Sequence, residues 1–410
     1  MKPMSKYAKK LLWLSVLLGW NGAARAQSTI APAVDSPDNP EYVNRGVQLG
    51  SIKLVPTFDF ATEYNDNVYA APNNGSSDAV FIASPQLRAT SSRGNIDFNA
   101  FGRMNITRFA SLKTENSVAA ATSAGVLWRA REGVSLGGDV GYNRLVEDRG
   151  DVERLRNPAS GPRLTEMLSA SMKFRHERGR LRFDLNGLVQ KYDALAARDD
   201  DRDFTTYSLA AKAGTRITGT TYITATAFVS HRDFRIPDLA GGFSRNSNTY
   251  GARAGLDFTS NAFLDGHIGV GVFRFNATAA EIEDHTGISV DANITYRPRR
   301  RTAIVINAFQ GDVATFRLGA AARTDTQVGV TLQQEVRHNL FGSAGLSWLK
   351  NEYRTRVNAL RTVQAQGKME LLISRQFSTI ASVTYAKRTS DNPIEPFERF
   401  RANIALRFAV

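Results

Sequence analysis

Hydrophobic and polar residues alternate over an unusually long stretch that begins at residue 52. Even positions from Ile52 onward are mostly apolar, as at Phe58 and Phe60, whereas odd positions include Lys53 and Asp59. This period of two is typical of a β-strand with one apolar and one polar face. Strands of soluble proteins average about 5–6 residues, whereas a tilted membrane strand needs about 9–11. The pattern continues to residue 64 and therefore predicts a strand long enough to cross a membrane.

The same pattern recurs along the rest of the chain, up to the C-terminal run in which Phe400, Ile404 and Phe408 alternate with Arg401 and Arg407. Short polar breaks interrupt it at residues 91–94, 176–179, 218–220, 260–262, 297–301, 337–339 and 374–376. Longer polar connections lie between these breaks, including residues 146–163, 196–203 and 388–399. Tight turns that alternate with long loops are typical of an outer-membrane barrel.

The number of strands decides what the apolar face contacts. We predict an all-β fold, a transmembrane antiparallel outer-membrane β-barrel of about 18 strands, with 16 as the alternative count. Soluble barrels filled by side chains stop near 8 strands, whereas barrels of about 16–18 strands enclose an aqueous lumen. Stacked soluble sandwiches have shorter strands on average and lack the rhythm of short and long connections. The apolar face is therefore expected to contact lipid, and the polar face to line the lumen.

The chain divides into three predicted segments. Residues 1–26 are a predicted signal peptide, because a lysine-rich start precedes an apolar run and an Ala24-Arg25-Ala26 cleavage site. Residues 27–46 are rich in Pro, Ser, Asp and Asn and are expected to form a flexible periplasmic N-terminal segment. Residues 47–410 are expected to form the barrel. The predicted localisation is the outer membrane of a Gram-negative cell, after export and signal cleavage.

Charge and cysteine content narrow the functional classes. Removal of the signal peptide lowers the formal net charge from +13 to +8, which remains basic. In an exported protein this charge favours anionic polymers, phosphate groups or lipid headgroups as partners and disfavours nucleic acid. The chain has no cysteine, which excludes disulfides, thiolate metal sites and a cysteine nucleophile. Outer-membrane lipid and lipopolysaccharide are the expected surroundings of the apolar face.

Basic residues on the polar faces of the strands are the candidate site residues. The predicted lumen and mouth residues are Lys53, Arg88, Arg103, Arg182, Arg253, Lys368, Arg401 and Arg407. Barrel closure is expected to bring Lys53, Arg88 and Arg407 close together near the periplasmic mouth, with Lys368 one hairpin away. Such a mouth would attract an anionic solute or polymer. The alternative interpretation is an ordinary charged lumen, because acidic residues share the same faces.

Motifs for catalysis or cofactor binding are missing from the sequence. The five histidines lie in separate hairpins, and none belongs to a metal-ligand or Ser/Asp pattern in sequence. No phosphate-binding glycine loop precedes a helix. We therefore expect no cofactor and no enzymatic activity, although a Ser/His pair that forms only in the folded barrel remains open.

The segment from Gly46 to Ala70 resembles the start of the Putative beta-barrel porin 2 family. The residues that carry the resemblance are Gly46, Gly50, Ser51, Pro56, Tyr64, Asn65, Asp66, Asn67, Val68 and Tyr69. The remainder of the chain is similar to the family in its strand rhythm. The resemblance implies an outer-membrane barrel encoded with exopolysaccharide or capsule genes, which passes an acidic or neutral polysaccharide. It assigns no role to any single residue.

Three functional hypotheses follow. The first is a pore for export of an exopolysaccharide or capsular polysaccharide, which works with periplasmic or inner-membrane export components. The second is a general or small-solute porin, which predicts steady conductance without a polymer phenotype. The third is a lipid-modifying barrel enzyme, which requires a Ser or Asp within hydrogen-bond reach of a His at the lipid-facing rim.

Overall fold

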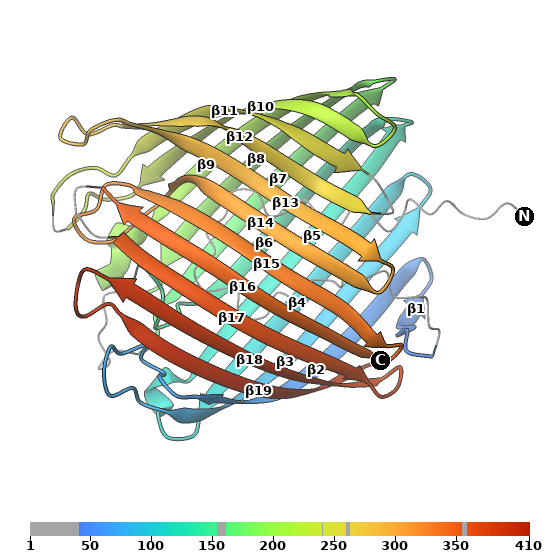
Figure 1. Ribbon diagram of the computed structural model, residues 1–410, viewed down its shortest axis with the longest axis horizontal. Helices are drawn as coiled ribbons and strands as arrows, with labels where there is room; N and C mark the ends of the chain where they lie inside the picture. Colours follow the sequence, from blue (N-terminus) through green and yellow to red (C-terminus); the bar gives the residue numbers. More distant parts are fainter. Residues whose placement is uncertain (1–40, 154–160, 240, 260–262, 355–358) are drawn as a thin grey trace, which may run out of the picture.

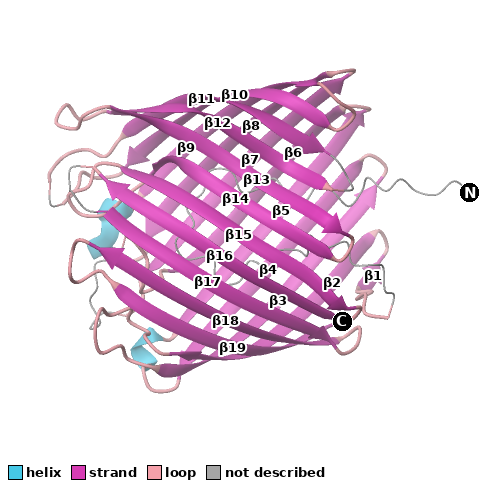
Figure 2. Ribbon diagram, viewed as in Figure 1, coloured by secondary structure: helices cyan, strands magenta, loops and turns pink. Residues whose placement is uncertain are grey.

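Eighteen strands, β2 to β19, close into one antiparallel barrel (Figures 1 and 2). This computed structural model describes residues 41–153, 161–239, 241–259, 263–354 and 359–410. Each strand pairs with its neighbours in sequence, and β19 pairs with β2 to complete the ring. The predicted all-β membrane barrel of about 18 strands is confirmed. The predicted signal peptide and most of the N-terminal segment lie outside the described residues.

The strands have similar lengths of 12 to 16 residues, apart from the short β1. Their bounds are β1 Val47–Leu49, β2 Ile52–Asn65, β3 Asp78–Arg93, β4 Ile96–Phe109, β5 Ser117–Arg131, β6 Val134–Val146, β7 Leu164–Arg178, β8 Leu181–Ala194, β9 Phe204–Arg216, β10 Thr221–Phe234, β11 Ser247–Thr259, β12 Leu264–Ala277, β13 His285–Arg299, β14 Thr302–Val313, β15 Arg323–Arg337, β16 Leu340–Tyr353, β17 Ala359–Leu372, β18 Phe377–Ser390 and β19 Phe397–Ala409. A tilt of about 45° makes such strands roughly 30 Å tall along the barrel axis, enough to cross a bilayer.

The two ends of the barrel differ in their connections. Turns such as the one between β3 and β4 join strands at the short-turn end, where β1 also lies (Figure 1). The long connections gather at the opposite, long-loop end, which also holds the 3₁₀ helices η3 (Lys113–Glu115) and η4 (Ala197–Arg202) (Figure 2). Among the described residues, no helix is long and apolar enough to cross a membrane.

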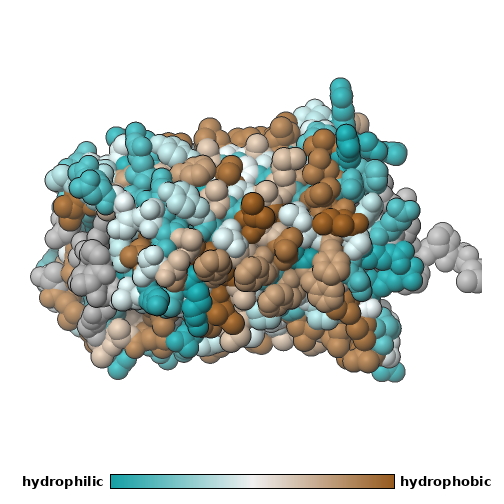
Figure 3. Space-filling model, turned by 90° about the horizontal axis from the view of Figure 1, so that it is seen from below, coloured by the Kyte–Doolittle hydropathy of each residue, from teal (hydrophilic) through white to brown (hydrophobic). Residues whose placement is uncertain are grey.

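Apolar side chains cover the outside of the barrel. Phe58, Leu87, Val126 and Leu346 are each more than one third exposed, and their cross-strand partners point to the same side. Figure 3 shows hydrophobic side chains over the body of one side of the barrel, with hydrophilic ones concentrated towards the ends. Exposed aromatic residues lie near both ends of the strands: Tyr207, Tyr250 and Trp348 towards the long loops, and Trp128, Tyr296 and Phe408 towards the short turns. Such belts are typical of barrels at the depth of lipid headgroups.

The seam between the first and last barrel strands explains the proline in β2. Strand β19 pairs with β2 only as far as Ala409 and Thr57, and the Val410 amide donates to the Pro56 carbonyl at 3.1 Å. In an antiparallel strand the amide and carbonyl of one residue face the same neighbour. The missing amide of Pro56 therefore faces the end of the chain and interrupts no continuous ladder.

Candidate functional site

The inner wall of the barrel carries charged residues that contact one another across several strands. Arg182 on β8 forms an ion pair with Asp257 on β11, and the Lys212 ammonium on β9 lies 3.3 Å from the same carboxylate. Arg253 on β11 lies 3.3 Å from Asp291 on β13. Side chains diverge on the outside of a barrel and converge on the inside, so contacts that skip strands are made in the lumen. Arg182 and Arg253 therefore line the lumen, and both are paired.

A second group of lumen charges lies near the seam. The Arg407 guanidinium donates to both carboxylate oxygens of Asp59, at 2.8 and 3.0 Å, and lies 3.3 Å from Glu370 on β17. Lys368 lies 3.0 Å from the other oxygen of Glu370. Arg103 on β4 donates to the Asn105 side chain at 2.9 Å on the same inner face. The structure thus brings Arg407 and Lys368 together around one carboxylate.

Lys53 and Arg88 lie closer to the short-turn end than Arg407 does. Arg407 is opposite Asp59 in the register, six positions further along β2 than Lys53, which corresponds to about 20 Å of strand. The reason is that β19 ends opposite Thr57, so β2 continues past the seam. The Lys53 ammonium donates to the Asn44 carbonyl at 3.3 Å, and the Arg88 guanidinium lies 5.5 Å from the Phe101 ring centre. The three cations are spread along the wall, and their joint role as a mouth stays a prediction.

The connection after β6 crosses the lumen. In an 18-stranded ring, the strands opposite β6 and β7 are β15 and β16, nine positions away. The Tyr353 hydroxyl, at the end of β16, donates to the Val152 carbonyl at 2.9 Å. Glu153 accepts from Arg323, the first residue of β15, and from the Thr315 hydroxyl at 2.9 Å. Residues 147–153, which we call the acidic segment, therefore reach the opposite wall.

Five buried arginines surround the acidic segment. They are Arg202 in η4, Arg317 in the loop after β14, Arg323 on β15, Arg388 on β18 and Arg399 on β19. Each is at most 9% exposed, and we call them the arginine ring. Arg202 donates to Glu147 at 3.1 Å, and Arg399 donates to Asp148 at 2.7 Å. Arg401 lies 3.8 Å from the second oxygen of Asp148. Four acidic residues of one loop thus lie within a ring of cations contributed by distant parts of the chain.

Two carboxyls of the acidic segment have opposite pKa shifts. Burial raises the pKa of Asp151 to about 6, and the nearby negative charge of Glu147 adds to the increase. Burial also acts to raise the pKa of Asp148, but the guanidinium groups of Arg399 and Arg401 outweigh it and hold that pKa well below its usual range. Asp148 therefore stays charged at any physiological pH, whereas Asp151 titrates in the mildly acidic range.

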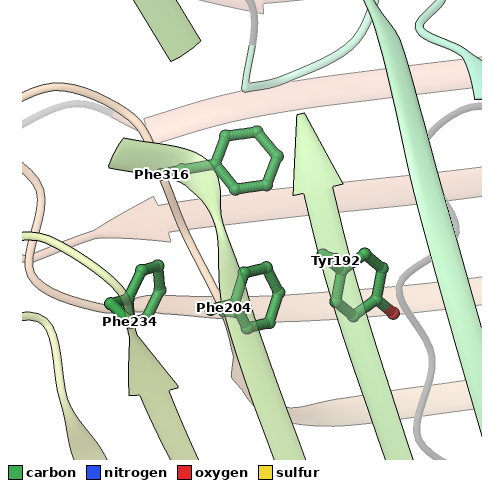
Figure 4. Close-up of a cluster of buried hydrophobic side chains, with 5 residues drawn as sticks. Tyr192, Phe204, Phe234 and Phe316 are labelled. Atoms are coloured by element: carbon green, nitrogen blue, oxygen red, sulfur yellow. The ribbon is translucent and has the colours of Figure 1, made fainter. Parts of the chain in front are cut away.

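A second inward loop, residues 314–322, packs against lumen aromatic residues. Tyr192, Phe204 and Phe234 are register partners on β8, β9 and β10, and their rings are stacked at 4.5 and 4.9 Å between centres. Figure 4 shows the three rings side by side, with Phe316 of the loop close by. The Arg202 guanidinium lies 4.5 Å from the Phe316 ring centre, which connects this cluster to the arginine ring.

Sequence reasoning missed both the lumen aromatic residues and the acidic segment. Tyr192, Phe204 and Phe234 lie on the polar faces of their strands, so the alternation of apolar and polar positions gave no signal for them. The sequence identified residues 146–163 only as a long polar connection and did not show whether it folds into the lumen. A local signal was present, because four acidic residues occur within residues 147–153, but their arginine partners are far away in sequence.

The histidines do not form the enzyme-like arrangement. His231 faces outward, and its Nδ1 lies 2.8 Å from the Asn248 side-chain oxygen. His267 lies 3.2 Å from Asp291 in the lumen. Within the described part of the chain, no serine hydroxyl forms a hydrogen bond with a histidine, and no group of three or more His, Asp or Glu side chains could hold a metal ion.

A sequence profile described as Putative beta-barrel porin 2 matches residues 39–410. The chain belongs to this porin family. The segment that carries the family resemblance joins the two sides of the seam. The Asn67 side-chain amide donates to the carbonyls of Ala71 and Glu398 at 2.8 and 2.9 Å, and its oxygen accepts from the Ala71 amide. Asp66 accepts from the Phe400 amide at 2.7 Å. These contacts tie the first loop of the porin to β19.

The glycines of the porin-family segment have a backbone role. Gly46 has a φ of +65°, and a Cβ atom there would lie 2.3 Å from the Leu54 carbonyl oxygen. Gly50 has a φ of +59° in the turn between β1 and β2. Positive φ values and so close an approach favour glycine over every other residue. The segment therefore shapes the barrel entrance and seam, and it contributes Lys53 and Asp59, the partner of Arg407, to the lumen wall.

Comparison with solved structures finds outer-membrane transporters that resemble this porin at low identity. The apoprotein form of the FrpB iron transporter from Neisseria meningitidis (F5-1 variant) aligns with a TM-score of 0.47 and 8% identity, over 82% of this chain and 61% of that one. Copper transporter OprC aligns with a TM-score of 0.43 and 10% identity, over 86% of this chain and 63% of OprC. The siderophore receptor PirA from Pseudomonas aeruginosa aligns with a TM-score of 0.42 and 8% identity, over 87% of this chain and 80% of PirA. The chain thus spans less than two thirds of FrpB and OprC. The search of curated proteins finds no match.

Proposed function

We propose that this porin passes an acidic exopolysaccharide or capsular polysaccharide through the outer membrane. The observation that carries the proposal is a row of cations along the seam side of the lumen, which we call the basic track. Its residues, from the short-turn end to the long-loop end, are Lys53, Arg88, Arg103, Arg407, Lys368, Arg401 and Arg399. Cations along the whole height of one wall lower the cost of moving a polyanion through the pore.

Charge balance distinguishes the basic track from the other lumen charges. On the far wall, Arg182 and Lys212 share Asp257, and Arg253 pairs with Asp291, so the cations there are largely neutralised. On the seam wall, Asp59 and Glu370 form ion pairs with Arg407 and Lys368. No acidic partner within the described residues contacts Lys53 or Arg88. The excess positive charge thus lies on one side of the lumen, starting at the short-turn end.

In this proposal the polymer reaches the short-turn end from a periplasmic or inner-membrane assembly and leaves past the long loops. The porin itself performs no chemistry on the polymer and needs no cofactor. The lipid-facing girdle holds it in the membrane, in contact with lipid and lipopolysaccharide. Its contribution is a lumen wide enough for a polymer, as expected of an 18-stranded barrel, and a wall that attracts negative charge.

Deletion of the gene in its native host tests this function. The proposal predicts that the deletion strain accumulates polymer inside the cell envelope and releases little into the medium. Wild-type protein restores release, whereas the Lys53→Glu/Arg88→Glu variant restores it poorly, although it reaches the membrane at the same level. Unchanged polymer release by the deletion strain would refute the proposal.

A small-solute porin is the second candidate, and the acidic segment favours it. A loop that crosses the lumen narrows the space available to a solute, as inward loops do in porins of this size. This candidate predicts that purified protein conducts ions steadily and that the deletion strain takes up small anions more slowly. It also predicts normal polymer release, which separates it from the first candidate.

A further inference from the structure

The acidic segment contacts the arginine ring through carboxylates and carbonyl groups, which other molecules also carry. Its carboxylates contact three of the arginines: Glu147 with Arg202, Asp148 with Arg399, and Glu153 with Arg323. Its main-chain carbonyls provide the others, since Arg388 donates to Gly150 at 2.5 Å and to Asp151 at 3.4 Å. Arg317 donates to Val152 at 3.4 Å. What the ring binds is a segment with two turns and several carboxylates.

The segment also carries one cation, but that cation does not face the ring. Arg149 forms a buried ion pair with Glu115 of η3, and its guanidinium lies 5.3 Å from the Tyr69 ring centre. The segment thus presents only acidic side chains and carbonyls to the ring. Guanidinium groups bind carboxylates through paired, charge-assisted hydrogen bonds, and a buried guanidinium without an anion is costly. Arg202 and Arg399 therefore depend on the carboxylates of the segment, whereas Arg317 and Arg323 also pair with Glu395 and Asp325.

From these contacts we propose that the arginine ring is a binding site for the carboxylates of an acidic polysaccharide, and that the acidic segment is its internal competitor. The inference rests on the proposed function and deepens it by naming the substrate class. An incoming polyuronate replaces one carboxylate with another, so the buried arginines stay paired throughout. A neutral polysaccharide offers no such replacement and leaves the segment in place.

Asp148 is the first carboxylate of the acidic segment that a carboxylate of the polymer replaces. Its side chain is 30% exposed, whereas those of Glu147 and Glu153 are 6% and 1% exposed. It lies between Arg399 and Arg401, and the Arg401 side chain is itself 20% exposed. Arg401 belongs to the basic track as well. A polymer that follows the track therefore meets Asp148 before any other carboxylate of the segment.

Calorimetric titration of the full-length protein in detergent micelles with oligogalacturonate, an uncrosslinked chain of uronate residues, tests the proposal. Asp148→Asn leaves two arginines without their carboxylate and keeps the side-chain size. We expect this variant to bind oligogalacturonate about tenfold more tightly than wild type, the scale of one charge-assisted hydrogen bond. Asp284→Asn is the matched control, because it frees the exposed Arg274 at the same end of the barrel, 3.1 Å from Asp284. The control should bind as wild type does.

Further variants separate the outcomes. Arg399→Gln/Arg401→Gln should lose the binding, and neutral maltodextrin of equal length should bind none of the proteins. Heat-modifiable migration of the folded barrel in gels verifies that each variant is folded. Equal affinities for wild type and Asp148→Asn, an equal gain in the Asp284→Asn control, or no binding by any of them would overturn the inference. Each of these results leaves the deletion experiment unaffected, so the pore function is judged separately.

Discussion

Glu153 and Arg323 form an ion pair between opposite walls of the barrel. They are 170 residues apart in the chain, and their side chains are 1% and 3% exposed. Because Glu153 belongs to the connection after β6 and Arg323 begins β15, the pair fixes the acidic segment across the lumen. The room available to a solute at this depth is therefore determined by a loop as well as by the strands.

Replacing Glu153 should release the acidic segment from the far wall. Glu153→Ala removes the acceptor of Arg323, of the Thr315 hydroxyl and of the Phe316 amide. We expect a larger single-channel conductance in planar bilayers, because the segment no longer spans the lumen. Glu352→Ala is the control, since Glu352 is half-exposed and, among the described residues, its carboxylate pairs with Lys350 at 2.7 Å. Equal conductance of Glu153→Ala and wild type would mean that the segment does not limit the pore.

Acidification should tighten the packing of the acidic segment. Burial raises the pKa of Asp151 to about 6, whereas a released, solvated aspartate titrates near about 3.9. The packed segment thus binds a proton more tightly than the released one, so packing is favoured at low pH and weakens as pH rises through about 6. The shift corresponds to a free-energy difference on the order of 3 kcal/mol.

Bilayer recordings between pH 7 and pH 5 test this effect. We predict that wild-type conductance falls towards pH 5 and that Asp151→Asn, which cannot ionise, shows little change over the same range. The Asp148→Asn variant should keep the pH dependence, because the pKa of Asp148 lies well below this window. A pH dependence that persists in Asp151→Asn would assign the titration to another group.

The seam contacts of Asn67 should contribute measurably to stability. Asn67→Ala removes the hydrogen bonds to Ala71 and Glu398 and leaves partly buried backbone groups without these partners. We expect a loss of about 1–3 kcal/mol, measured by urea unfolding in lipid vesicles. Asn95→Ala, which loses one exposed bond to Arg129 in a short turn, should cost less. Equal losses of unfolding free energy in the two variants would show that the seam contacts of Asn67 stabilise the barrel no more than an exposed turn contact does.

Charge reversal at the entrance of the basic track should change ion selectivity. Lys53→Glu/Arg88→Glu converts two lumen cations without an acidic partner among the described residues into anions. The reversal potential in a salt gradient should move from anion towards cation selectivity. Lys191→Glu, on the exposed outer face of β8, is the control and should leave selectivity unchanged. An unaltered reversal potential in the lumen variant would count against the track.

Local sequence pattern was sufficient for the strands. The parity of Phe58 and Phe60 determined which face of β2 contacts lipid, and the same rule placed Arg182 and Arg253 in the lumen. Strand alternation depends only on neighbouring residues, so it can be followed along the chain. Alternation alone does not identify the inner face of residues 222–234, because apolar rings such as Phe228 occur on that face, where Phe228 contacts Arg253.

The lumen contents could not be predicted in the same way. The partner of Glu153 follows only from closure of the ring, which places β15 opposite β6, nine strands away. The spacing between Lys53 and Arg407 likewise depends on where β19 ends against β2. Both relationships are set by register and closure, which involve residues far apart in the chain. The acidic segment and its arginine ring are therefore properties of the folded barrel.

The most direct test of the account is a planar-bilayer recording with oligogalacturonate added on the short-turn side. A polyanion that passes through the lumen should interrupt the ionic current, and each interruption should become shorter as the driving voltage rises. Maltodextrin of equal length should produce no voltage-dependent events. Interruptions that lengthen with voltage, or none at all, would contradict the claim that this porin conducts an acidic polysaccharide.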